Sequence, residues 1–434
     1  MKKLISLISA GMLLAGAVSC GGKNGKGTSD TGKTELIVYL TTGDPAYSYN
    51  MNEKFGSISG KYDIKETNYL TESGLDTERA ITNMNTDILS GKIPDIIITS
   101  PDVMNSLRKK DYLADLTPYL EGDTGVSTGD FYPNVIEGLR TDGEINALFT
   151  NYRLNTACAK SSFYGEELTD WSYKDAIAAC KNTPEGSNFL GSFFNILTSE
   201  YFLPLLGRES IDLENNSCDF SGPFREALQF VSEAQKDGFE SYNDFDTFIH
   251  DHALVYYSPA DGINGWIYDF YYNFEGTGDL TFVGVPSVNG GGSYTNISAM
   301  VGIMSTSPRK EEAYEFISEM FSSDAQESIA LSSGIPVIRD SAHAVTTGNY
   351  KYKAGTIYQN ASSHSGQGTF SMSQEQIDQF LGYLDNVTFE PYYDTMLDDI
   401  IKEEYTSVLN GEQSVDDCVE MLNNRIGTYL SENS

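Results

Sequence analysis

ILSGKIPDIIITSPDVMNSL, residues 88–107, is the stretch that decides the fold. Its centre, Pro94–Thr99, is a short apolar run rich in β-branched residues, which is typical of a buried strand. Gly91 ends the helical pattern that precedes it. Ser100-Pro101 begins the next helix, because serine caps helix N-termini and proline suits the first turn. A strand between two helices indicates the repeating unit of an α/β fold.

Segments before this stretch continue the same rhythm. Leu36–Leu40 is a continuous apolar run and Tyr62–Glu66 alternates, so both are predicted as strands. Residues 77–90 carry apolar side chains at helical spacing, which predicts a helix between the second strand and the third. Strands and helices that alternate in this way predict βαβ units with a parallel sheet.

The length of the chain favours more than one core. It has 434 residues, of which 40% are hydrophobic and 21% are charged, as in globular proteins. Chains of this size usually divide into lobes, so two are expected. No stretch after the N-terminus is long and apolar enough to span a membrane.

The N-terminus has the pattern of a targeting segment. Lys2 and Lys3 precede an apolar stretch that ends at Val18, and small residues lead into Cys20. This segment resembles a bacterial lipoprotein signal, which implies a signal peptide over 1–19 and a lipid on Cys20. Residues 21–34 are rich in Gly and polar residues, which predicts a flexible tether with a span on the order of 20 Å. The alternative is an ordinary secretory signal with a chance cysteine.

Charge and cysteine content exclude several classes. The net charge is −34, from 62 acidic and 28 basic side chains, so we expect no nucleic-acid partner. The same charge disfavours a strongly anionic ligand and favours a neutral one. The cysteines after Cys20 have no CxxC spacing and predict neither a zinc ribbon nor a dense disulfide scaffold; a single disulfide among them stays open. They are Cys158, Cys180, Cys218 and Cys418.

Several blocks, in this order, resemble the family 1 extracellular solute-binding proteins, which include maltose- and oligosaccharide-binding proteins. They sample nearly the whole chain after the N-terminal segment. They are ILSGKIPDIIIT (88–99), LRKKDYLADLTPYLE (107–121), FYPNVIEGLRTDGEINALFTNY (131–152), FREALQFVSEAQKDGF (224–239), SPRKEEAYEFISEMFSSDAQESIALSSGIPVIRDS (307–341) and GEQSVDDCVEMLNNRIGTYL (411–430). One departure is Phe149, where the family commonly has proline.

The resemblance implies a two-lobe α/β fold of the periplasmic-binding-protein type, each lobe a mostly parallel sheet flanked by helices. We expect lobe 1 over 35–148 plus about 297–350, and lobe 2 over 149–296 plus about 351–434, with the C-terminal helices. It implies the substrate-binding subunit of an ABC importer, which captures a carbohydrate in the inter-lobe cleft and delivers it to the permease by hinge closure. Its partners are then a sugar-like solute, the permease subunits and, through Cys20, the outer face of the cell membrane; a monomer without cofactor is expected.

Two kinds of side chain are candidates for binding such a solute. Aromatic rings stack on the apolar faces of sugars, and the chain contains 28 Tyr and 2 Trp. Trp266, in a polar Gly-rich loop where the family often places a ligand-facing tryptophan, is the stacking candidate; packing is its alternative role. Packing is the expected role of Trp171.

Polar candidates follow predicted strands, because ligands of open α/β sheets bind beyond the carboxyl ends of strands. Asp102 could instead cap the helix that it begins, and Asp44 could be only a turn residue beside Pro45. The full set of predicted ligand-binding residues is Asp44, Thr99, Asp102, Asn151, Tyr152, Asp261, Trp266, Tyr294 and Arg339.

Enzymatic signatures are weak. His250 and His252 could share a strand face, but no HExxH motif accompanies them, so no metal site is predicted. The sequence has neither a GxSxG elbow nor a phosphate-binding GxxxxGK[ST] loop. The paired acids Asp398-Asp399 and Glu403-Glu404 fall on a predicted helix, where a solvated face is the expected role. A binding protein is therefore favoured over two alternatives, a lipid-anchored glycan hydrolase and a surface adhesin or receptor module.

Overall fold

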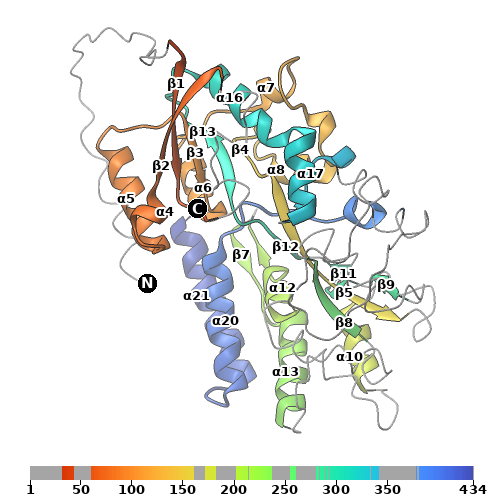
Figure 1. Cartoon of the computed structure of the whole chain (residues 1–434). Helices are drawn as coiled ribbons and strands as arrows, with labels where there is room; N and C mark the ends of the chain where they lie inside the picture. The colour runs from red at the N-terminus through yellow and green to blue at the C-terminus, as the bar shows by residue number, and fades with distance from the viewer. Residues whose placement is uncertain are drawn as a thin grey trace.

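The elements of the chain form two lobes, one above the other in Figure 1. The computed structural model describes residues 32–43, 60–160, 172–181, 202–213, 215–236, 255–260, 280–282, 284–288, 290–292, 294–332, 334–341, 378 and 381–433. Among these residues, no helix combines the length and the apolar character that a membrane crossing requires.

The first lobe is built on a sheet in the order β2-β1-β3-β13-β4. β1 pairs in parallel with β2 and β3, whereas β13 runs antiparallel to β3 and β4. β3 is buried along its whole length, as its continuous apolar sequence predicts. The strands are β1 (Thr34–Leu40), β2 (Tyr62–Asn68), β3 (Ile96–Thr99), β4 (Ala147–Leu148) and β13 (Met300–Ile303).

Helices flank this sheet, with α4 against β1 and α16 against β13. In α5 the apolar spacing places Ala80, Met84 and Ile88 in the core, and the Asp76 carboxylate caps the first turn by accepting from Arg79 N at 3.0 Å. The helices of this lobe are α4 (Tyr69–Glu72), α5 (Thr77–Leu89), α6 (Pro101–Arg108), α7 (Thr117–Leu120), α8 (Pro133–Leu139), α16 (Lys310–Ser318) and α17 (Ser323–Ser332).

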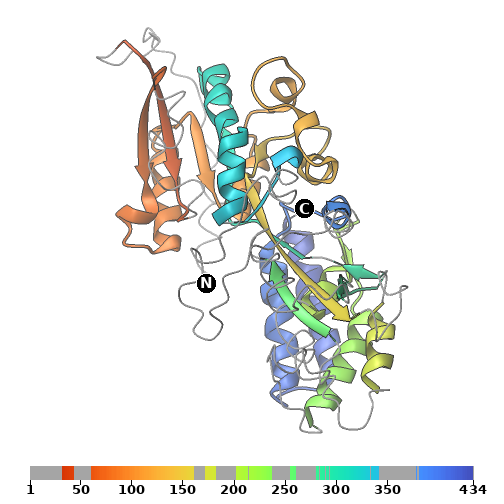
Figure 2. The ribbon, with the colours of Figure 1, turned by 45° about the vertical axis from the view of Figure 1, so that its right-hand side comes forward.

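The second sheet is organised around the long strand β5, which runs from the upper lobe into the lower one (Figures 1 and 2). Its described partners β8, β9, β12 and β14 all pair with it antiparallel. The α/β class is as predicted, but the sheets are mixed rather than mostly parallel: among the strands that the structure describes, parallel pairing joins β1 to β2 and β3, and the other strand pairs are antiparallel. The strands are β5 (Asn151–Lys160), β8 (Val255–Ala260), β9 (Leu280–Phe282), β12 (Tyr294–Asn296) and β14 (Ile335–Pro336).

Helices make up most of the remaining part of the second lobe that the structure describes. The C-terminal pair α20 and α21 pack on each other and on α12 and α13. Short hairpins pair β6 with β7 and β10 with β11. The elements are α10 (Tyr173–Lys181), α12 (Phe202–Arg208), α13 (Pro223–Lys236), α20 (Thr395–Leu409), α21 (Val415–Asn433), β6 (Ile211–Asp212), β7 (Ser217–Cys218), β10 (Val285–Pro286) and β11 (Gly291–Gly292).

Buried apolar side chains form one cluster in each lobe. The first includes residues of β1, β3, β13 and α16 and extends to Leu154 of β5 and to Phe389. The second includes Ala157, further along β5, together with apolar faces of α12, α13, α20 and α21. The chain therefore passes between the cores along β5 and again between Phe389 and Tyr393.

Candidate functional site

The structure describes the side chains of Thr99, Asp102, Asn151, Tyr152 and Arg339 among the predicted ligand-binding residues. For Tyr294 it describes the backbone, which pairs with Asn155 in the antiparallel contact of β12 and β5. Asp44, Asp261 and Trp266 lie outside the described residues, as do Cys20, His250 and His252.

Thr99 ends β3 and is fully buried. Its hydroxyl lies 2.7 Å from the hydroxyl of Thr41, which follows β1, because the parallel register of β1 and β3 brings the two strand ends together. A buried hydroxyl needs a partner, and Thr41 provides one. Thr99 thus holds the ends of neighbouring strands together and is not exposed to solvent in this arrangement of the chain.

Asp102 lies in the first turn of α6. In Figure 1, α6 lies above the upper ends of α20 and α21. Asp102 Oδ2 accepts a hydrogen bond of 3.0 Å from the hydroxyl of Thr395, the first residue of α20. Neither Ser100 nor Asp102 makes a side-chain cap bond to α6, so the capping alternative for Asp102 is not what the structure shows. Asp102 instead contacts the other lobe.

Charged and aromatic groups of the second lobe surround this contact. Asp394 caps α20 and accepts at 2.6 Å from the hydroxyl of Tyr429 on α21. Asp398 binds Arg208 of α12, with Arg208 Nε 2.9 Å from Asp398 Oδ1. The Arg208 guanidinium also lies 3.9 Å from the ring centroid of Tyr393. We call this set the junction cluster: Asp102, Arg208, Tyr393, Asp394, Thr395, Asp398 and Tyr429.

The carboxyl of Asp102 is affected by this environment. Loss of hydration raises its pKa above the ordinary value, the hydrogen bond from Thr395 opposes that change, and the negative charges of Asp394 and Asp398 add to it. Asp398 is balanced by the charge of Arg208, whereas the side chain that donates a hydrogen bond to Asp102 is the uncharged hydroxyl of Thr395. Asp102 therefore remains a proton-accepting group at the junction of the lobes.

Asn151 and Tyr152 begin β5, where the chain leaves the first core. Asn151 is buried, and its Nδ2 donates to Thr150 Oγ1 at 3.1 Å. Gly334 packs closely on both residues: a Cβ at position 334 would lie 2.8 Å from Asn151 Oδ1 and 3.1 Å from Tyr152 O. This close approach requires glycine at position 334.

Tyr152 is buried at the crossing, and burial raises the pKa of its phenol well above the ordinary value. Its ring makes an edge contact with Phe389, with the centroids 4.8 Å apart. Phe149 also packs on the ring of Phe389, with the two ring centroids 5.7 Å apart. Phe149, the departure from the family pattern, thus joins the start of β5 to the later crossing segment near Phe389.

Arg339 is exposed and pairs with Asp385 at 3.0 Å. The same segment is tied to β5, because the hydroxyls of Tyr383 and Thr156 lie 2.6 Å apart. Arg339 and Tyr152 therefore belong to one neighbourhood at the crossing, while Asp102 belongs to the junction cluster and Thr99 to the first core. Among the residues that the structure describes, no hydrogen bond or ion pair joins these groups into a single site.

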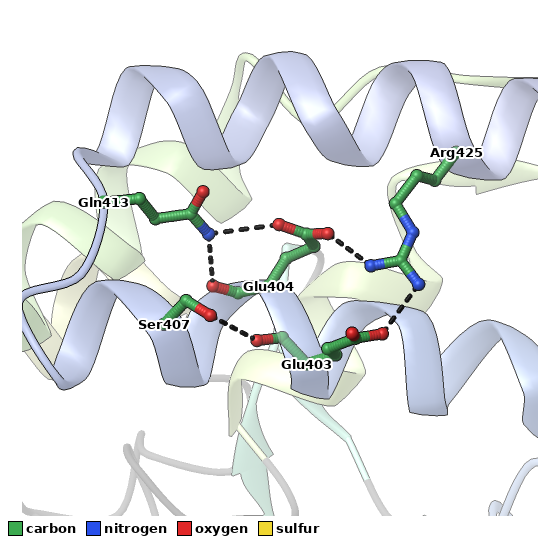
Figure 3. A network of polar contacts seen from close by, with 5 residues as sticks. All are labelled: Glu403, Glu404, Ser407, Gln413 and Arg425. Carbon is green, nitrogen blue, oxygen red and sulfur yellow. Dashed lines mark hydrogen bonds and ion pairs between the residues drawn. The ribbon is translucent and has the colours of Figure 1, made fainter.

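The paired acids of α20 have structural partners. Figure 3 shows Arg425 of α21 between Glu403 and Glu404, with Arg425 Nη2 2.7 Å from Glu403 Oε2. Glu404 is buried, also contacts Arg425, and accepts from Gln413 Nε2 at 3.1 Å. The predicted solvated face is therefore right for Glu403 and wrong for Glu404, which has a buried ion pair. Among the described residues, no group of three or more His, Cys, Asp or Glu side chains could hold a metal ion.

The family profile of the bacterial extracellular solute-binding proteins matches residues 66–327. No curated protein sequence gives a significant match. The fold is similar to the sugar-binding protein MalE of Xanthomonas citri, with 16% identity, a TM-score of 0.61 and coverage of 92% of this chain and 98% of that one. It is also similar to an extracellular solute-binding protein family 1 structure from Alicyclobacillus acidocaldarius, with 14% identity, a TM-score of 0.59 and coverage of 92% of this chain and 98% of that one. A third similar structure is a cyclic α-maltosyl-1,6-maltose binding protein from Arthrobacter globiformis, with 14% identity, a TM-score of 0.57 and coverage of 92% of this chain and 100% of that one.

Proposed function

This chain belongs to the bacterial extracellular solute-binding protein family, and on that premise we propose that it is the substrate-binding subunit of an ABC importer that captures a carbohydrate. The observation that carries the proposal is the family match over residues 66–327, on a chain whose two cores are joined by crossing segments. Members of such a family bind solutes rather than transform them, so the glycan hydrolase alternative is not favoured.

A carbohydrate is the solute class that agrees with the rest of the chain. Two of the similar structures are described as sugar-binding or maltosyl-maltose-binding proteins. The net charge of −34 disfavours a strongly anionic solute, and the chain is 12% aromatic. We propose that Trp266 stacks on the sugar, and that Asp102 and Asp261 accept hydrogen bonds from its hydroxyl groups.

Hinge closure would connect binding with delivery. A ligand held by groups of both lobes favours the arrangement in which the lobes are close, and it shifts the population by its difference in affinity for the two states. Asp102 belongs to the first lobe, and Asp261 and Trp266 lie in the sequence between β8 and β9 of the second. The closed form would then be the form that the permease recognises.

We propose further that the protein is a lipoprotein held at the outer face of the membrane. The basic, apolar and small-residue segments that precede Cys20 support cleavage there and a lipid on its thiol. Residues 21–34 would act as a tether between the lipid and β1, which begins at Thr34.

Uptake by living cells tests this proposal. Deletion of the gene from its host is expected to abolish uptake of a labelled oligosaccharide at low external concentration, and the wild-type gene in trans is expected to restore it. Cys20→Ser should move the protein from the membrane fraction to the soluble fraction. Cys218→Ser, the matched control, should leave the protein in the membrane fraction. Uptake that survives the deletion would contradict the importer role. Retention of Cys20→Ser in membranes would contradict the anchor.

A further inference from the structure

Two buried tyrosines lie where the crossing segments meet. Tyr132 is the N-cap residue of α8 in the first lobe, Tyr152 is the second residue of β5, and each is 1% exposed. Both flank the same short segment, because Tyr152 pairs with Ile335 of β14 and the Tyr132 amide donates to Val337 O at 3.2 Å. The first lobe, β5 and the segment around β14 therefore come together at these two side chains.

The later crossing segment lies at the same place. The side-chain amide of Asn134, two residues after Tyr132, donates to Leu384 O at 2.9 Å and to Val387 O at 2.7 Å. The ring of Tyr152 packs against Phe389, which follows on the same segment. Both tyrosines are thus covered by segments that are far apart in the sequence.

The two phenol hydroxyls are buried but have no hydrogen-bond partner within the described part of the chain. The neighbouring Tyr383 differs, because its hydroxyl lies 2.6 Å from Thr156 Oγ1. A buried hydroxyl that makes no hydrogen bond costs stability, and folded proteins rarely keep one. Buried polar atoms that no protein group can pair are commonly paired by an ordered water molecule, which needs about two to four polar partners.

The two phenols and the Asp385 carboxylate are electrostatic neighbours. Burial raises the pKa of Tyr152, and ionisation of Tyr132 raises it further. Burial also raises the pKa of Tyr132, and the Asp385 carboxylate adds to that change. The phenols are therefore close enough to affect each other but do not bond directly, which is the separation that a bridging water spans.

We propose that the hydroxyls of Tyr132 and Tyr152 form a binding site for one ordered water molecule where the crossing segments meet. A water can accept from one phenol and donate to the other, so that it pairs both hydroxyls at once. Water is the guest that fits, because both hydroxyls are shielded from solvent and a sugar ring would reach them only by displacing the crossing segments. The water would tie α8 of the first lobe to the start of β5. This site belongs to the protein without solute and does not rest on the proposed function.

Chemical denaturation of the purified mature protein, without solute, tests the site through Tyr132→Phe and Tyr152→Phe. Each substitution should raise the equilibrium constant for unfolding about fivefold, the size of one hydrogen bond, because the other phenol loses its bridge. The double variant should stay well below the roughly 25-fold loss that independent effects would give, because the second substitution removes a hydroxyl that the first has already left unpaired. Tyr314→Phe is the matched control for loss of a direct bond, since the Tyr314 hydroxyl donates to Val126 O at 2.6 Å.

Two results would overturn the water site. A gain in stability from both single substitutions would mean that the hydroxyls have no partner in the free protein, and losses that multiply in the double variant would mean that they share none. A crystal structure of the free protein provides the direct check. One water within about 2.5–3.0 Å of both phenol oxygens is expected, and a crossing without it would also contradict the proposal. Because no solute is present, these results are independent of the uptake experiment.

Discussion

Phe389→Ala is expected to lower the free energy of unfolding by about 3–5 kcal/mol, the range for truncation of a buried phenylalanine. Phe389 is 5% exposed and contacts the rings of Phe149 and Tyr152. It also packs on Gly138, where a Cβ would lie 2.6 Å from the Phe389 Cβ. Alanine would remove both ring contacts and leave a cavity where the crossing segments meet.

Chemical denaturation measures this loss as a shift of the midpoint at constant slope. Phe389→Leu keeps an apolar side chain in the site and should lose less. Leu89→Ala, at a leucine that is 77% exposed, should change stability by no more than about 0.5 kcal/mol. A loss below about 1 kcal/mol for Phe389→Ala would mean that the crossing segments are not held together by this ring.

Arg425→Met is expected to cost about 3 kcal/mol, because it leaves the buried carboxylate of Glu404 without its cation. Glu404 has a side chain that is 8% exposed and keeps Gln413 as a donor. Arg425 itself is 29% exposed, so the expected cost lies at the lower end of the range for breaking a buried pair.

The neighbouring acid provides the matched control. Glu403 binds the same guanidinium, but its side chain is 68% exposed, so Glu403→Gln should cost only about 0.2–1 kcal/mol. The double variant Arg425→Met with Glu404→Gln removes the uncompensated charge and should recover part of the loss. Equal losses for Glu403→Gln and Arg425→Met in denaturation would contradict the buried pair as the source of stability.

Local patterns in the sequence predicted the individual elements well. The helix expected over 77–90 is α5 (Thr77–Leu89), and the helix expected to begin at Ser100-Pro101 is α6 (Pro101–Arg108). Ser307-Pro308 has the local pattern of a helix start, but α16 begins at Lys310. Ser307 Oγ donates to the buried Asp95 carboxylate at 2.6 Å, and Arg309 contacts the same carboxylate at 3.1 Å. A distant partner therefore moved the start of that helix, which no local pattern reveals.

The arrangement of the strands was harder to predict. Period and composition identify a strand but not the direction of its neighbour. The antiparallel partners of β5 come from segments up to 185 residues away, as in the pairing of Pro336 with Asn151. Among the described strands, the parallel pairing that a βαβ rhythm predicts is found for β1, β2 and β3.

The site could be predicted only in part. Asp102 was identified from its place after a strand, but its partner Thr395 is 293 residues away, and nothing near either residue signals the contact. Arg208 and Tyr429 were missed for the same reason. Thr99 follows a strand as expected, yet the adjoining strand end provides its partner, Thr41, and buries it.

The most direct test of solute binding is thermal unfolding of the mature protein against mono- and oligosaccharides, with amino acids, peptides and polyamines as controls. A ligand that binds only the native state should add about 2.7 kcal/mol of stability at 100 times its Kd. We predict that one class of sugar raises the midpoint, that Trp266→Ala loses this shift, and that Trp171→Ala keeps it. A shift with a control compound alone would contradict the carbohydrate assignment, and no shift with any compound would contradict solute binding and favour a surface adhesin.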